Sequence, residues 1–189
     1  MDAPHNNREL KVLIRACIKG DRRSQEKLYK KFYAYAMGIC LRYSKDREEA
    51  EEILNDGFLK IFARLEQQRN LDAFKGWLRK TMIHTAIDYY RKHQKHHSHL
   101  DIVSIKKESK QADSLSMLSS KEILSMVQKL TPGYRMVFVL YAIEGFKHPE
   151  MAQKLDISVG TSKSNLAKAR ARLRQMLASA DAENLEQYG

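Results

Sequence analysis

Apolar residues recur at helical spacing along almost the whole chain, and a single polar stretch interrupts them. Between residues 10 and 18 the large apolar side chains lie three or four positions apart, and this pattern stops at Gly20-Asp21. Further apolar stripes occupy residues 23–44, 46–65 and 74–95. Spacings of three and four place side chains on one face of an α-helix, so each segment is predicted to be an amphipathic helix.

The interruption spans residues 93–118, which are polar, charged and poor in large apolar side chains. Such a composition cannot bury a core and is typical of a linker. Helical periodicity resumes near Ser120. The sequence therefore predicts an all-α protein of two small helical domains joined by a flexible linker. The predicted divisions are a first domain at 1–95, the linker at 96–118, a second domain at 119–180 and an acidic tail at 181–189.

Composition limits the classes of protein that this chain can represent. Only 8 Gly and 3 Pro among 189 residues argue against a sheet-rich fold with many tight turns. A formal net charge of +11 favours a polyanionic partner. Cys17 and Cys40 lie within helical apolar patterns, as reduced core thiols do. The polar N-terminus and the lack of an apolar run of about 20 residues predict a cytoplasmic protein without membrane insertion.

The segment that begins PEMAQKL predicts two short helices joined by a tight turn. Pro149 suits a first helical turn, Gly160 suits the turn between the helices, and Thr161 is the expected N-cap of the second helix. A helix-turn-helix presents the N-terminal residues of its second helix to base edges, while basic residues hold phosphates. A solvated hairpin is the alternative, and the basic excess favours DNA. The candidate DNA contacts are Thr161, Ser162, Lys163, Ser164, Asn165, Lys168, Arg170 and Arg172.

Two earlier helices carry opposite charge. The helix at 74–95 has six basic residues against the single acid Asp88, with Trp77, Tyr89 and Tyr90 between them. Basic side chains can follow a phosphate backbone, and aromatic faces stack on unpaired bases at ~1–3 kcal/mol per base. Core packing is the alternative for Trp77. The helix at 47–66 is acidic on its polar side, which suits either a basic protein partner or plain solvation.

The sequence indicates no catalytic residue, metal site or cofactor. It contains no Walker loop, GxGxxG, HExxH or GxSxG motif. Four histidines cluster between residues 93 and 99, without cysteine, and are better explained as part of a solvated linker. A metal-dependent enzyme built on His84 and this cluster is one alternative function.

Four strings together resemble sigma-70 family RNA polymerase sigma factors of the extracytoplasmic-function (ECF) group. The resemblance covers residues 10–95 and 119–178. The strings are AEEILNDGFLKIF (50–62), FKGWLRKTMIHTAIDYYRK (74–92), LTPGYRMVFVLYAIEGF (130–146) and EMAQKLDISVGTSKSNLAKARARLRQML (150–177). In this family the first domain is region 2 and the second is region 4, a helix-turn-helix.

The resemblance implies a promoter-specificity subunit, which is not an enzyme. Its implied partners are the clamp of the largest subunit and the flap of the second-largest subunit of core RNA polymerase, duplex DNA at −35, single-stranded DNA at −10, and an anti-sigma factor. The implied polymerase-docking residues are Glu52, Asn55, Asp56 and Phe58. The implied −10 contacts are Arg69, Asn70, Lys75, Trp77, Lys80, His84, Asp88, Arg91 and Lys92.

Some positions depart from the family pattern. Glu52, Asn55 and Asp56 conservatively replace the usual Asp, Gln and Glu of the docking motif. His84 lies where many members have an Asn that helps to hold a flipped −10 base, which leaves the preferred base open. Lys147 lies where a Ser or Thr often caps the first helix of the hairpin, and a lost cap typically costs ~1 kcal/mol. The main alternative function is a two-domain LuxR-type regulator with the same hairpin, which would have no need of the acidic and basic aromatic helices.

Overall fold

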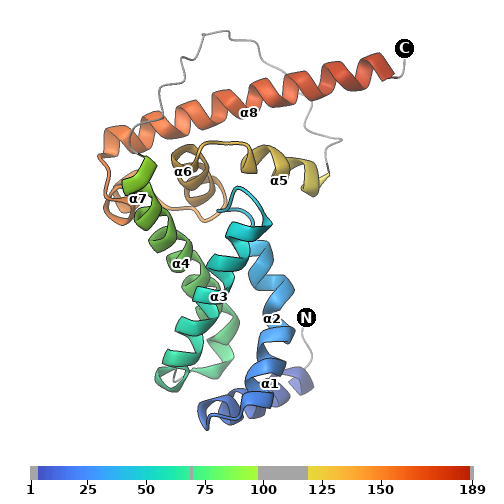
Figure 1. The fold of residues 1–189 in the computed structure, drawn as a ribbon, viewed down its shortest axis with the longest axis vertical. Helices are drawn as coiled ribbons and strands as arrows, with labels where there is room; N and C mark the ends of the chain where they lie inside the picture. The colour runs from blue at the N-terminus through green and yellow to red at the C-terminus, as the bar shows by residue number, and fades with distance from the viewer. Residues whose placement is uncertain (1–3, 69, 98–118, 188–189) are drawn as a thin grey trace. The chain divides into compact units, whose positions relative to one another are not determined.

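The computed structural model describes residues 4–68, 70–97 and 119–187, and every regular element within these ranges is helical (Figure 1). The prediction of an all-α fold is confirmed. The predicted linker lies outside the described residues except for its first two positions.

The chain forms two compact units. The first comprises residues 1–41 and 46–88, and the second comprises residues 42–45 and 89–189. The division falls within the fourth helix, after Asp88, so this helix contributes residues to both units.

Capping residues fix where the helices of the first unit begin. Gly20 has a φ of 81°, a conformation that glycine adopts without strain, and it ends the first helix. Asp21 then caps the second helix by accepting hydrogen bonds from the backbone N–H groups of Arg23 and Ser24. Asp46 caps the third helix, as predicted, through the N–H of Glu49 at 2.9 Å. The elements are α1 (Pro4–Ile18), α2 (Arg22–Cys40), α3 (Arg47–Arg64), η1 (Leu65–Gln67), η2 (Leu71–Ala73) and α4 (Phe74–His97).

The core of the first unit is aliphatic and aromatic, and α2 packs against both α1 and α3. Ile14, Leu28, Leu54 and Leu78 are completely buried in it. Gly57 on α3 lies directly against the buried Met82 side chain of α4, and a Cβ at this glycine would meet the Met82 sulfur. Glycine therefore allows the two helices to approach closely.

Both cysteines are buried thiols, as predicted. Burial raises the pKa of Cys17 to about 11 and that of Cys40 to about 12, because the low-dielectric core disfavours a thiolate. Both side chains therefore act as small apolar core groups.

Besides the end of α4, the described residues of the second unit form four helices. Ser119 caps α5 in a capping box with Glu122, and Pro132 stands at the start of α6. Thr131 occupies the N-cap position, but its hydroxyl makes no capping hydrogen bond. Helix α8 packs against the other three and continues to Gln187. The elements are α5 (Ser120–Gln128), α6 (Pro132–Ala142), α7 (His148–Leu155) and α8 (Val159–Gln187).

We expect Gly57→Ala to destabilise the first unit by about 1–3 kcal/mol, because its methyl group needs space that Met82 occupies. Urea unfolding followed by the fluorescence of Trp77, the single tryptophan of the chain, reports on this unit. The matched control is Gly38→Ala in α2, where a Cβ meets nothing within 4 Å and a gain of up to ~1 kcal/mol is expected. Equal unfolding midpoints for the two variants would contradict the close α3–α4 contact.

Candidate functional site

Helix α8 begins three residues earlier than the sequence predicted. The hydroxyl of Ser158 accepts a hydrogen bond from the backbone N–H of Thr161 at 2.9 Å, so Ser158 is the capping residue and Thr161 lies in the first turn. Gly160 is also helical and has no positive φ. The turn uses Asp156 instead, which ends α7 in the left-handed conformation at φ 57°. The predicted roles of Gly160 and Thr161 were therefore wrong.

The buried stripe of α8 contains Ser162, Leu166 and Ala169. Ser162 is completely buried, and its hydroxyl lies 3.0 Å from the Nδ1 atom of His148 on α7. A side chain in this position cannot reach a DNA base. The prediction that Ser162 contacts DNA is therefore corrected: it joins the two helices of the hairpin.

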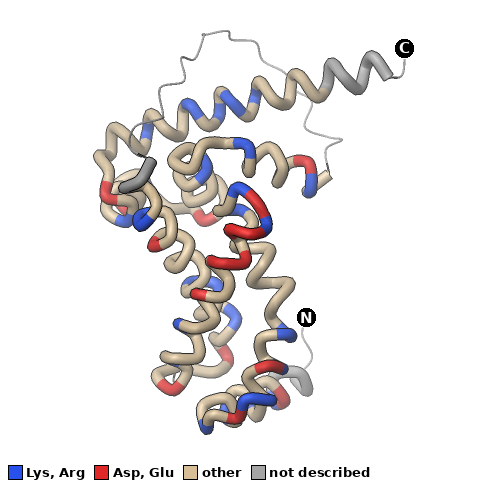
Figure 2. The backbone as a smooth tube through the Cα atoms, viewed as in Figure 1, with Lys and Arg blue, Asp and Glu red and all other residues tan. Residues whose placement is uncertain are grey.

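The polar residues of α8 form two rows on either side of the exposed face. A helix turns by about 100° per residue, so positions spaced by three, four or seven share a side. Small residues, Ser164 and Ala167, lie between the rows, and Figure 2 shows the basic positions repeating along the helix in blue. The Lys168 row consists of Thr161, Asn165, Lys168 and Arg172, and the Arg170 row consists of Lys163, Arg170 and Arg174.

An aromatic ring of α6 lies beneath each row. The ammonium of Lys168 is 5.9 Å from the ring centroid of Tyr134, and the guanidinium of Arg170 is 5.4 Å from that of Tyr141. Tyr141 also stacks on His148, with centroids 5.1 Å apart. Contacts between a cation and an aromatic face contribute about 0.5–1 kcal/mol at exposed sites and restrict where the charge lies.

Helix α4 presents a second exposed stripe, here named the α4 stripe. Its members lie on one side of the helix, and they are Lys80, His84, Asp88 and Arg91. Within the stripe Asp88 accepts a hydrogen bond from Lys60 of α3 at 2.8 Å, so this carboxylate already has a cationic partner.

The remaining predicted −10 residues are spread around this stripe. Trp77 is half-buried beside Phe74, with ring centroids 5.9 Å apart, while Lys92 is exposed. Lys75 lies on the opposite side of α4, with its ammonium 5.1 Å from the ring of Tyr35. The side chain of Asn70 accepts a hydrogen bond from the N–H of Asp72. Arg69 lies outside the described residues.

Helix α3 carries an acidic exposed stripe, here named the α3 stripe. Glu52, Asn55 and Asp56 are all exposed on one side, as predicted, and the first turns of the helix are largely red in Figure 2. Leu59 belongs to the same side at 68% exposure, and the sequence prediction missed it. Leu59 follows Asp56 by three residues and Glu52 by seven, and this spacing could have placed it on the same side of the helix.

Phe58 lies on the other side of α3. Only 2% of it is exposed, and its ring packs 4.6 Å from that of Tyr29 and 6.0 Å from that of Phe62. The prediction that Phe58 contacts a polymerase is therefore corrected: it belongs to the core. Tyr29 extends this aromatic cluster to the surface, where its hydroxyl donates a hydrogen bond to Asn55 at 3.2 Å.

Two family models match the chain. Residues 28–96 match Sigma-70 region 2, and residues 120–173 match Sigma-70, region 4, which together cover about two-thirds of the chain. The chain belongs to the sigma-70 family of RNA polymerase sigma factors. As a sigma factor it associates with RNA polymerase and recognises promoter DNA in transcription initiation.

Curated relatives agree with this assignment along most of the chain. The RNA polymerase sigma-H factor of Pseudomonas aeruginosa is 24% identical over 170 residues, covering 84% of this chain and 88% of the relative. The ECF RNA polymerase sigma-E factor of Haemophilus influenzae is 21% identical over 171 residues, with coverages of 84% and 90%. The sigma-E factor of Escherichia coli K12 is 23% identical over 171 residues, with coverages of 84% and 89%.

Two solved structures are also similar. One is CnrH in complex with the cytosolic domain of CnrY, at 22% identity and a TM-score of 0.45, covering 90% of this chain and 97% of that chain. The other is the sigma factor RpoE in complex with the anti-sigma factor NepR from Bartonella quintana, at 20% identity and a TM-score of 0.47, with coverages of 81% and 96%.

The matched ranges separate the sigma factor into its functional parts. The region 2 match begins within α2 and includes both the α3 stripe and the α4 stripe. The region 4 match runs from α5 into α8 and includes both rows up to Arg172. Helix α1 precedes both matches. The LuxR-type alternative is not retained, because the first unit carries region 2.

The part of the chain that the structure describes also bears on the metal-dependent alternative and on membrane insertion. Within it, no three side chains of His, Cys, Asp or Glu gather as metal ligands, but only His93 of the four clustered histidines has a described side chain. No described helix combines the length and the apolar character needed to cross a membrane.

We expect Ser158→Ala to weaken the start of α8 by ~1 kcal/mol, because the N–H of Thr161 loses its hydrogen-bond acceptor. Hydrogen exchange measured by NMR should show about fivefold less protection of the Thr161 amide. Thr161→Ala is the matched control, since it keeps the Ser158 cap and should change the protection of this amide much less. A larger loss at the Ser164 amide in Thr161→Ala than at the Thr161 amide in Ser158→Ala would restore the original N-cap prediction.

Proposed function

We propose that this sigma factor is of the ECF type and divides its work among three exposed surfaces. The α3 stripe docks on core polymerase, the α4 stripe holds the unpaired −10 strand, and the two rows of α8 contact the −35 duplex. One observation carries the proposal: an acidic surface and two basic surfaces lie on different helices within the matched regions. A protein partner and a nucleic acid need opposite charges, and this segregation provides both.

The polymerase contact is assigned to Glu52, Asn55, Asp56 and Leu59, against the clamp of the largest subunit. Leu59 supplies an apolar centre, with 68% of its surface available for burial, and the acidic residues around it select a basic partner surface. Interface cores are typically apolar within a polar rim, which is the arrangement of this stripe. Region 4 is assigned a second contact, with the flap of the second-largest subunit.

The −10 contact is assigned to the α4 stripe together with Trp77 and Lys92. Lys80 and Arg91 can neutralise phosphates, and the exposed His84 lies between them. Extruding a base from the stack costs a few kcal/mol, which pocket contacts must offset. Lys75 is left out of this contact because it lies on the other side of the helix.

The −35 contact is assigned to the start of α8 and its two rows. Thr161, Lys163, Ser164 and Asn165 remain exposed or half-exposed near the N-terminus of the helix, where a recognition helix meets base edges. Lys168 and Arg172 on one side, and Arg170 on the other, are placed to hold phosphates along the two edges of a groove.

The wider assignments follow from the same proposal. The domains are 1–95 and 119–180, with 96–118 as the linker, and the helical extension of α8 continues beyond the second domain. The chain acts in the cytoplasm, where core polymerase and promoters are found, and performs no catalysis itself. An anti-sigma factor is a further proposed partner, since the RpoE of B. quintana is bound to one.

Reconstitution with core polymerase of the encoding organism tests the proposal as a whole. The purified chain should co-elute with core on gel filtration. It should then direct transcripts from a small set of mapped promoters in vitro, while core alone should not. Co-elution without a promoter-specific transcript would contradict the DNA assignments, and failure to co-elute would contradict the docking assignment.

We expect the double variant Glu52→Lys and Asp56→Lys to lose core binding, because it reverses the charge of the surface that we propose meets a basic partner. Fluorescence anisotropy of labelled sigma factor titrated with core measures the loss, which should exceed tenfold in Kd, or about 1.4 kcal/mol. The matched control is Glu66→Lys on η1, an exposed acid outside the stripe. Similar weakening by the control would show a general charge effect and contradict a specific α3 contact.

We expect Lys168→Ala and Arg172→Ala to weaken −35 duplex binding by similar factors for every promoter sequence. Each should also lower the slope of log K against log salt by about 0.9, if each residue neutralises one phosphate. Anisotropy with a −35 oligonucleotide over a range of salt measures both effects. Asn165→Ala should behave differently, with an unchanged salt slope and an altered sequence preference. An unchanged slope in Lys168→Ala and Arg172→Ala would remove these residues from the contact.

A further inference from the structure

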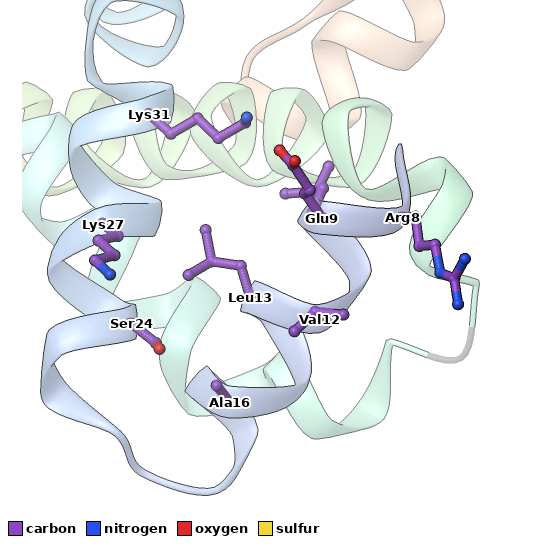
Figure 3. A pocket seen from close by; sticks show the side chains of 9 residues that line it. Arg8, Glu9, Val12, Leu13, Ala16, Ser24, Lys27 and Lys31 are labelled. Atoms are coloured by element: carbon purple, nitrogen blue, oxygen red, sulfur yellow. The ribbon is translucent and has the colours of Figure 1, made fainter. Parts of the chain in front are cut away.

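A surface groove between α1 and α2 is not used by any of the proposed contacts. Its accessible volume is about 630 Å³, and it opens along the length of α1 (Figure 3). All but one of its lining residues precede residue 28, so the groove lies almost wholly outside the region 2 match. A function assigned to this groove therefore goes beyond the promoter and polymerase contacts.

The floor of the groove is aliphatic. Leu13 points into the space between the two helices, and Val12 and Ala16 flank it from α1 (Figure 3). Val12 has 62% of its surface exposed and Leu13 is half-buried, so this apolar surface is available to a partner. Residues 12, 13 and 16 follow helical spacing, which makes the floor a continuous stripe rather than an isolated side chain.

The rim of the groove is basic. Lys27 and Lys31 project from successive turns of α2, and Arg8 lies at the end of the groove on α1. Glu9 is the only acid among the lining residues, and its carboxylate points toward Lys31 in Figure 3. The rim thus keeps a net positive charge next to an aliphatic floor.

We propose that this groove binds an amphipathic helix of a partner protein that has aliphatic residues on one side and carboxylates beside them. Such a helix would bury Val12 and Leu13 against its aliphatic residues and place its acids near Lys27 and Lys31. Nucleic acid fits less well, because the floor offers aliphatic groups and no aromatic ring for stacking. A membrane fits less well, because a concave floor between two helices cannot enter the bilayer.

A designed peptide tests this assignment on the full chain. The probe is an 18-residue helix with Leu at i, i+3, i+4 and i+7 spacing and Glu on one flank, and the control peptide has Lys in place of every Glu. The acidic peptide should bind in fluorescence anisotropy, and its affinity should fall with salt. Its NMR shift changes should map to α1 and α2. Preference for the basic peptide, or shift changes elsewhere, would overturn the proposal.

Two exposed substitutions separate the groove from the rest of the surface. Val12→Glu should weaken binding of the acidic peptide about tenfold, because it removes apolar contact and adds a like charge. Lys27→Glu should weaken it by a similar factor and improve binding of the basic peptide. Matched controls are Leu59→Glu on α3 and Lys30→Glu, which lies on α2 but does not line the groove. Equal effects of controls and groove variants would overturn the proposal.

Other occupants give distinguishable results. Binding of promoter DNA that Val12→Glu abolishes would assign the groove to nucleic acid and overturn the proposal. Concentration-dependent self-association that Val12→Glu abolishes, measured by sedimentation, would assign it to a second copy of the chain. The groove proposal can be tested separately from the docking and promoter assignments. The double variant Glu52→Lys and Asp56→Lys, and the variant Lys168→Ala, should leave peptide binding unchanged.

Discussion

Burial of a narrow stripe on each helix is the constraint on which the surfaces of this sigma factor depend. Helices of these lengths are marginal in isolation and gain their stability by burying one face against neighbours. In α8 the buried stripe of Ser162, Leu166 and Ala169 fixes the rotation of the helix, and that rotation alone decides that Lys168 and Arg170 lie on opposite edges. Packing in the core thus determines which residues of a helix are exposed to a partner.

The sequence predicted where the helices lie better than it predicted which residues of each helix are buried. Apolar spacing and caps are local signals, and the Asp46 cap located the start of α3. Ser162 and Phe58 were misjudged because their burial depends on partners distant in the chain: His148 lies on α7 and Tyr29 on α2. Leu59 was missed because an aliphatic residue in a helix is expected to face the core, whereas interfaces need apolar residues outside it.

Net charge describes this chain poorly, since its charges are sorted by helix. The overall value of +11 predicts a polyanionic partner, yet the α3 stripe is acidic and suited to a basic protein surface. At physiological salt, exposed charges act over about 8 Å, which is less than two helical turns. Each stripe therefore presents its own sign to a partner, and a basic groove between α1 and α2 can coexist with an acidic surface on α3 without cancelling it.

The tyrosine rings of α6 beneath the two rows of α8 restrict the positions of the basic side chains above them. Long basic side chains lose conformational entropy when they bind a phosphate, so a side chain restricted beforehand loses less. Tyr134 restricts Lys168, and Tyr141 restricts Arg170. Tyr141 is in turn stacked on His148, whose Nδ1 lies 3.0 Å from the buried hydroxyl of Ser162. Ser162, which does not contact DNA, thus supports the position of Arg170 through the rings of His148 and Tyr141.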